Sequence, residues 1–119
     1  MKVAVSALGA TMADRVDERF GRAMYLLIVD TETGLSEAVD NAANRNALQA
    51  AGIGAAEIVS DRGVAAVITG HLGPKAFAAL GTAGLRGYNG AGMTVEAAVE
   101  AFSAGLLDEL TEAGEAHSG

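Results

Sequence analysis

Residues 64–77, VAAVITGHLGPKAF, place a short apolar run directly before a glycine-rich turn and the start of a helix. The run over Val64–Thr69 is typical of a strand that is covered on both faces. Gly73 and Pro74 then open a helix, because proline is preorganised for the first helical position. A buried strand followed at once by a helix is the repeating unit of α/β proteins, so this stretch predicts a sheet with parallel strands.

The same kind of pattern extends along the chain in both directions. Strands are predicted over Lys2–Leu8, Met24–Val29, Leu35–Asp40, Val64–Thr69 and Leu85–Tyr88, and helices over Asn44–Arg62, from Gly73 to Gly84, and from Thr94 through Leu106. This order predicts an α/β sandwich on a mixed sheet, in which one strand of a hairpin runs against the others. Residues 1–107 are expected to form one domain, followed by an acidic, frayed tail over residues 108–119.

Two glycines interrupt the first predicted helix. Gly52 and Gly54 each cost up to about 1 kcal/mol relative to alanine inside a helix. They therefore predict a late helix start, a mobile first turn, or a close approach of another part of the backbone.

The composition excludes several classes of protein. A chain of 119 residues with 50% apolar residues is expected to form a single folded domain rather than a disordered segment. It has no cysteine, which excludes disulfides, thiolate catalysis, zinc fingers and iron–sulfur clusters ligated by cysteine. It also lacks an apolar run of about 18 residues and an N-terminal signal pattern, so a cytoplasmic protein with no membrane partner is expected.

The charge is unevenly distributed. The formal net charge is −7, all eight lysines and arginines lie between Lys2 and Arg86, and residues 90–119 contain acidic residues but no basic ones. Nucleic-acid binding depends on neutralising phosphates, so no nucleic-acid partner is expected. An anionic ligand would have to be held by a local site within the first 90 residues.

The topology indicates where a ligand would bind. Ligands of open α/β sheets bind beyond the carboxyl ends of the parallel strands, where loops 9–22, 70–74 and 89–93 are expected to meet. His71 precedes a helix N-terminus, which attracts anions, and Lys75 adds a cation in its first turn. Two interpretations stay open: a ligand role for His71, or a tight turn with a histidine that faces solvent.

The loop over residues 9–22 contains three arginines among acidic residues. Arginines could clamp an anion while carboxylates fix their geometry, or the loop could be solvated and held by weak ion pairs. The second interpretation is favoured for Arg15 and Arg19. Arg22 follows Phe-Gly at the entry to a buried strand and is the candidate for an anion contact.

Nucleotide-binding motifs are absent from the glycine-rich stretches. Residues 52–57, GIGAAE, lack the third glycine of the dinucleotide fingerprint and do not directly follow a strand. Residues 70–75, GHLGPK, lack the spacer and the Ser or Thr of a phosphate-binding loop. No nucleotide cofactor is expected.

Four stretches together resemble one known family. They are Val16–Ala23 (VDERFGRA), Gly52–Ala56 (GIGAA), Val67–Phe77 (VITGHLGPKAF) and Gly92–Ala98 (GMTVEAA). Their order and spacing, from Lys2 to about Leu107, resemble the dinitrogenase iron–molybdenum cofactor biosynthesis family. The resemblance implies a three-layer α/β/α sandwich with a ribonuclease H-like motif, whose five-stranded mixed sheet has the order 3-2-1-4-5 with one antiparallel strand.

The resemblance also implies a function. Members of the family hold or deliver a preformed metal–sulfur cofactor and generally catalyse no reaction, so a noncovalently bound molybdenum–copper sulfide or iron–molybdenum sulfide cluster is expected, with partner proteins that donate or accept it. Such a cluster brings its own sulfide ligands and negative charge, and it needs cations and N–H groups. The expected binding residues are Arg22, Asn44, Gly52, His71, Gly73, Lys75 and Gly90, with His71 also a candidate metal ligand.

Other functions stay open beside the resemblance. A small hydrolase or phosphoryl-transfer enzyme could use His71 with Asp14 or Asp17, and an adaptor could bind a partner through the acidic tail. A two-metal nuclease needs several carboxylates at strand ends, but Asp30 and Asp40, which end strands, belong to no cluster. The apolar fraction and the helix caps predict a monomer or weak dimer that folds without metal.

Overall fold

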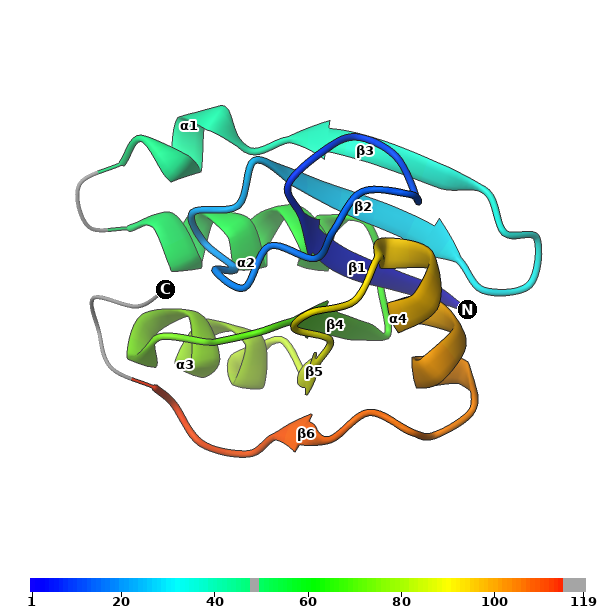
Figure 1. The fold of residues 1–119 in the computed structure, drawn as a ribbon. Helices are drawn as coiled ribbons and strands as arrows, with labels where there is room; N and C mark the ends of the chain where they lie inside the picture. The colour runs from blue at the N-terminus through cyan, green and yellow to red at the C-terminus, as the bar shows by residue number, and fades with distance from the viewer. Residues whose placement is uncertain (48–49, 115–119) are drawn as a thin grey trace.

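The computed structural model describes residues 1–47 and 50–114, which form one mixed sheet with helices on both faces (Figure 1). The elements in chain order are β1 (Lys2–Ala7), β2 (Tyr25–Asp30), β3 (Ser36–Asp40), α1 (Ala42–Arg45), α2 (Ala51–Asp61), β4 (Ala66–Thr69), α3 (Pro74–Thr82), β5 (Arg86–Asn89), α4 (Val95–Ser103) and β6 (Glu109–Leu110). The strands lie side by side in the order β3-β2-β1-β4-β5-β6.

Alternating side chains of the central strands build two cores. Ala4, Leu26 and Val67 face α2 and α3 on one side of the sheet. Their chain neighbours Val3, Leu27 and Ile68 face α4 on the other side. Because side chains of a strand alternate between the two faces, an unbroken apolar run such as residues 26–29 supplies both cores at once. The expected three-layer arrangement is confirmed.

The strand directions agree with the expected topology and extend it. β1 is parallel to β4, and β4 is parallel to β5, whereas β2 is antiparallel to both β1 and β3. The order 3-2-1-4-5 with one reversed strand is therefore confirmed for the first five strands. The expected total of five is wrong, because β6 pairs antiparallel with β5, with Gly87 opposite Leu110.

Part of the acidic tail is ordered, because it contains β6. Leu110 packs against the core beside α2 and α3, and the Gly114 N–H donates to the Leu72 carbonyl oxygen at 2.7 Å. The fraying expected from residue 108 is therefore wrong for residues 109–114. The open edge of β5 supplies the pairing partner that the tail sequence itself does not reveal. Residues 115–119, the rest of that predicted tail, lie outside the described residues.

The helix predicted over Asn44–Arg62 is interrupted. A single turn, α1, ends at Arg45, and α2 begins only at Ala51. Next to this break, the carbonyl oxygens of Arg45 and Ala47 accept hydrogen bonds from the Arg22 guanidinium. Of the three explanations offered for the two glycines, a late helix start is confirmed, and so is a close backbone approach, at Gly52.

The last helix begins as the sequence predicts. Thr94 caps α4, because its hydroxyl oxygen accepts the Ala97 N–H at 3.1 Å. The helix ends at Ser103, and Leu106, predicted to continue its apolar face, has an exposed fraction of 75%. Within the described residues, no helix is long and apolar enough to cross a membrane.

Candidate functional site

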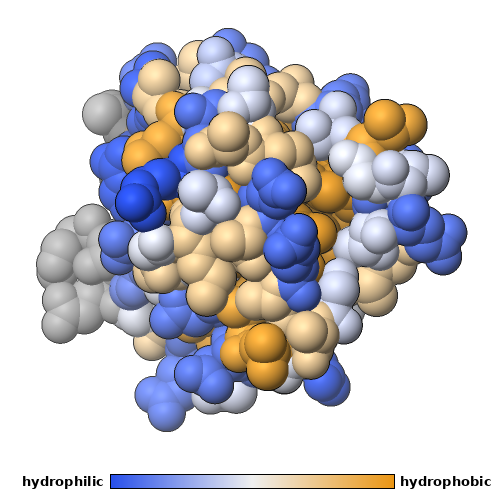
Figure 2. All heavy atoms as spheres, turned by 45° about the vertical axis from the view of Figure 1, so that its right-hand side comes forward, coloured by the Kyte–Doolittle hydropathy of each residue, from blue (hydrophilic) through white to orange (hydrophobic). Residues whose placement is uncertain are grey.

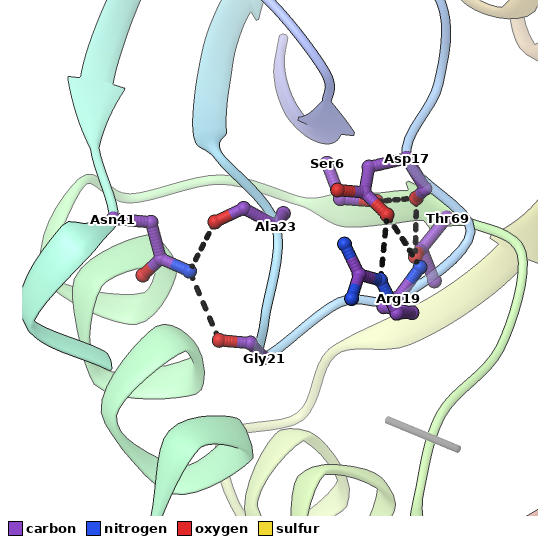
Figure 3. Close-up of polar contacts among 7 residues, drawn as sticks. All are labelled: Ser6, Asp17, Arg19, Gly21, Ala23, Asn41 and Thr69. Carbon is purple, nitrogen blue, oxygen red and sulfur yellow. Dashed lines mark hydrogen bonds and ion pairs between the residues drawn. The ribbon is translucent and has the colours of Figure 1, made fainter. Parts of the chain in front are cut away.

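A buried polar cluster joins the loop over residues 9–22 to the sheet. The Ser6 hydroxyl lies 2.6 Å from both the main-chain oxygen of Asp17 and the hydroxyl of Thr69 (Figure 3). Ser6 lies near the end of β1 and Thr69 closes β4, while Asp17 belongs to the loop between β1 and β2. All three residues are at most 3% exposed, so this cluster fixes the loop over the carboxyl ends of the two parallel strands.

The loop over residues 89–93 contacts the loop over residues 9–22. The Val16 N–H donates to the Met93 carbonyl oxygen at 3.0 Å, and the Arg15 guanidinium donates to the Gly92 carbonyl oxygen at 2.7 Å. Arg19 forms a β-bridge with His71, which brings the loop after β4 alongside. The expected meeting of the three loops at this edge is therefore confirmed by direct contacts.

Two helices begin at the same edge of the sheet, at the left of Figure 1. The N-cap residues of α2 and α3 are Ala50 and Gly73, and neither helix start has a side-chain cap. A Cβ added to Gly52 would lie 2.7 Å from the Cβ of Ala76, so the first turns of the two helices are in contact. Adjacent helix N-termini without caps present unpaired N–H groups and a positive partial charge.

The loop between β1 and β2 crosses this pair of helix starts. Gly21 packs so closely on Gly52 that a side chain at either position would overlap the backbone or Ala76. Close packing therefore requires glycine at both positions. This requirement is the physical reason why Gly52, a predicted site residue, is a glycine. Gly52 is buried, so its role in the structure is to let backbones meet.

His71 lies at the end of β4, next to the start of α3. Gly73, the N-cap of α3, has extended backbone angles, and Lys75 is exposed in the first turn. The structure thus groups these three predicted site residues. The tail also reaches this position, because Gly114 packs against the imidazole ring of His71 with no room for a side chain. Residues 110–114 therefore lie along one side of the candidate site.

Arg22, the predicted anion contact, donates hydrogen bonds to main-chain oxygens of the protein itself. Its guanidinium donates to the carbonyl oxygens of Arg45 and Ala47, at 3.0 and 2.9 Å. It therefore holds the turn between α1 and α2 against the loop between β1 and β2. Arg22 is half-buried, and these contacts place its positive charge next to the start of α2.

Two asparagines also hold the loop between β1 and β2 in place. The Asn41 amide, 1% exposed, donates to the carbonyl oxygens of Gly21 and Ala23, each at 3.0 Å (Figure 3). Asn44 donates to the side-chain oxygen of Asn41 at 2.9 Å, and its own side chain fills the space above Gly54. Asn44, predicted as a binding residue, thus belongs to the support of the loop that contains Arg22.

Gly90 lies at the same edge but on the other face of the sheet from the other predicted site residues. It is buried, and a Cβ there would meet Ile68 at 2.6 Å and Ala98 at 3.2 Å, on the face of the sheet that α4 covers. Its N–H donates to the carbonyl oxygen of Thr69. The remaining predicted residues lie around the starts of α2 and α3, on the opposite face.

The carboxylates proposed for an enzymatic alternative have structural partners. Asp14 accepts hydrogen bonds from the Thr11 hydroxyl and the Thr11 N–H, which hold the pKa of Asp14 below its ordinary value, mainly through the hydroxyl. One oxygen of Asp17 accepts from the N–H and the guanidinium of Arg19, whereas the other is buried without a partner among the described residues. Within residues 1–47 and 50–114, no three His, Cys, Asp or Glu side chains are grouped so as to hold a metal ion.

Two basic residues at this edge, Arg45 and Arg19, were not among the binding residues predicted from the sequence. Arg45 follows Asn44 in α1, and its Nε is buried with no hydrogen-bond partner within the part of the chain that the structure describes. In the single long helix expected from the sequence, Arg45 would lie in the first turn. Arg19, expected only to form ion pairs, does pair with Asp17 at 3.4 Å, yet it also lies beside His71. The position of Arg19 directly before Phe-Gly was the sequence feature that could have placed it in the site.

The sequence and the fold of the chain are similar to those of known proteins. A family model described as dinitrogenase iron-molybdenum cofactor matches residues 1–105. The apo form of the orange protein from Desulfovibrio gigas has a similar structure, with a TM-score of 0.91 and 37% sequence identity, covering 96% of each chain. A putative NifB protein from Thermotoga has a TM-score of 0.83 and 35% identity, covering 96% of this chain and 97% of that one.

A relative known from sequence is more distant. An uncharacterized protein from Methanocaldococcus jannaschii is 28% identical over 100 residues, which cover 82% of this chain and 84% of that protein. The family model covers most of the chain, and the two solved structures match nearly its whole length in fold. The chain belongs to the dinitrogenase iron-molybdenum cofactor family.

Proposed function

We propose that this protein binds and carries a molybdenum-containing metal–sulfide cluster, without covalent attachment and without catalysing a reaction. One observation supports the proposal most directly: two uncapped helix starts and several basic side chains share the edge of the sheet where three loops meet. In a chain with a net charge of −7, this edge offers an anion a local site. The iron-molybdenum cofactor for which the family is named, and the apo form in which the similar orange protein was solved, suggest the nature of the cargo.

The chemistry of the residues suits a cluster that brings its own ligands. The chain has no cysteine, so no thiolate is available to bind a metal. Bridging and terminal sulfides of a preformed cluster are negatively charged acceptors, for which backbone N–H groups and cations are the matching partners. Both a molybdenum–copper sulfide and an iron–molybdenum sulfide cluster meet this description.

Each residue of the site has a specific proposed role. The N–H groups at the start of α3, from Gly73 onward, donate to sulfide, and Lys75 adds an exposed positive charge in the same turn. His71 donates a hydrogen bond or, alternatively, binds a metal atom directly. Arg22 and Arg45 supply positive charge from the turn before α2. Partner proteins that deliver or accept the cluster then approach this edge of the sheet.

Reconstitution with a defined probe tests the proposal. The protein is mixed anaerobically with tetrathiomolybdate, alone and with cuprous ion, and passed over a desalting column; retained molybdenum and the visible spectrum are then measured. We expect retention that falls as salt is raised, because contacts between partly exposed charges are screened. Lys75→Gln should weaken retention by roughly threefold to tenfold, the effect of one charged contact near the surface.

The control is a matched change of charge elsewhere. Arg62→Gln removes one positive charge at the opposite end of α2 and should leave retention within about twofold. His71→Asn keeps one donor and should reduce retention only in part. Retention that ignores salt and is the same in the Lys75, His71 and Arg62 variants would place the cluster away from this edge and contradict the proposal.

A further inference from the structure

A concave surface lies on the face of the sheet that α4 covers, between α4 and the turn that joins β2 to β3. This groove has a volume of about 680 Å³. It is lined by Met12, Val29, Asp30, Thr31, Gly34, Glu96, Val99, Glu100, Ser103 and Ala104. Figure 2, which brings the right-hand side of Figure 1 forward, shows apolar atoms in a hollow between hydrophilic side chains.

The groove has an apolar floor. Val29 and Val99 are 0% and 7% exposed, so they lie at its bottom, and Met12 offers a flexible side chain that adapts to different shapes. Two large side chains close to its ends are strongly exposed: Leu35, which follows Gly34, is 73% exposed, and Leu106 is 75% exposed. Exposed apolar surface around a groove is typical of an interaction site.

The rim of the groove is acidic. Glu96 and Glu100 project from α4, Asp30 lies across from them, and no lysine, arginine or histidine of the described chain lines the groove. The Glu32 N–H, more than any other group, holds the pKa of Asp30 below its ordinary value, with smaller contributions from the N-terminal ammonium and Lys2. These two cations offset the charge of Asp30 in part, whereas Glu96 and Glu100 have no ion-pair partner among the described residues.

We propose that this groove is a docking site for a partner protein that inserts a large apolar side chain flanked by lysine or arginine. An apolar anchor would fill the space above Val29 and Val99, and basic neighbours would match the carboxylates of Glu96 and Glu100. A small molecule is less well suited, because most of the rim, including Ser103, is exposed and would leave it half in water.

A second copy of this chain is not the proposed occupant. In a two-fold symmetric pair the same patch meets itself, so Glu96 and Glu100 of each copy would face like charges. The groove lies on the face of the sheet that α4 covers, whereas α2 and α3 cover the opposite face. A docked partner would therefore leave the proposed cluster site open, and this inference does not depend on the identity of the cargo.

Titration with a synthetic peptide tests the docking site. The full chain, labelled with ¹⁵N, is titrated with a peptide of alternating leucine and lysine and, separately, with one of alternating leucine and glutamate. We expect amide shifts confined to residues 29–34 and 96–104, and only with the lysine peptide. The double variant Glu96→Lys with Glu100→Lys should weaken binding by at least about tenfold: about a factor of three for each carboxylate lost, with repulsion by the new lysines added to it.

Matched variants separate this site from general attraction between an acidic protein and a basic peptide. Glu57→Lys with Asp61→Lys makes the same change of charge on exposed positions of α2 and should leave the affinity within about twofold. Ala104→Trp fills the groove and should also abolish the specific shifts. Equal weakening by both double variants, shifts elsewhere on the surface, or concentration-dependent shifts of the chain alone would overturn the proposal.

Discussion

Replacing Asn41 by alanine is the sharpest test of how the candidate site is supported. The buried Asn41 amide donates to two main-chain oxygens, of Gly21 and Ala23, and its side-chain oxygen accepts from Asn44. Alanine leaves two buried acceptors without donors, at about 1–3 kcal/mol each, so we expect a loss of roughly 2–6 kcal/mol in the free energy of unfolding. A chain of this size has a total free energy of unfolding of roughly 6–18 kcal/mol, so the change is large.

Urea unfolding followed by circular dichroism measures this loss. Asn44→Ala is the matched control, because Asn44 is only partly buried and makes one side-chain bond to Asn41; it should cost about 0.5–1.5 kcal/mol. A loss in Asn41→Ala below about 1 kcal/mol, or no larger than that in Asn44→Ala, would refute the reasoning. The loop with Arg22 would then be held mainly by packing.

Asn41→Asp separates hydrogen bonding from packing, because it keeps the shape of the side chain. The introduced carboxylate would face two carbonyl oxygens, which favours the protonated form and raises the pKa of the new carboxyl group in the folded state. A folded-state pKa above the unfolded one adds stability at low pH that is lost as pH rises through the folded value. We therefore expect this variant to be least stable at neutral pH and to recover as pH falls, whereas Asn41→Ala should show no such trend.

Two further predictions concern the loop after β1 and the tail. Thr11→Val removes the hydroxyl that lowers the pKa of Asp14, so the carboxyl titration observed by NMR should move up toward its ordinary value. The stabilisation linked to that carboxylate is complete above the unfolded pKa and lost as pH falls through the folded one, so wild type and variant should converge in acid; an unchanged titration would contradict the assignment. Removing residues 112–119 takes away the Gly114 contact, so diethyl pyrocarbonate should modify His71 faster, as measured by peptide mass spectrometry. Equal rates in the full and shortened chains would mean that the tail does not shield the ring.

Much of the fold is determined by local sequence. The buried strand over residues 66–69, the start of α3 at Pro74 and the cap of α4 at Thr94 each depend on side chains within a few positions of one another. The order of these elements, with right-handed crossovers, then brings the strand ends and their loops to one edge. For this reason the sequence also predicted that loops 9–22, 70–74 and 89–93 meet there.

Other features exist only because distant segments meet. β6 depends on the open edge of β5, and no pattern in the acidic tail predicts that pairing. At the break between α1 and α2, the carbonyl oxygens of Arg45 and Ala47 accept hydrogen bonds from Arg22, which is more than 20 residues away in the chain. A hydrogen bond between residues far apart in the chain leaves no periodicity in the sequence, so tertiary structure alone decided the support of the site, the separation of Gly90 from it, and the contact of the tail with His71.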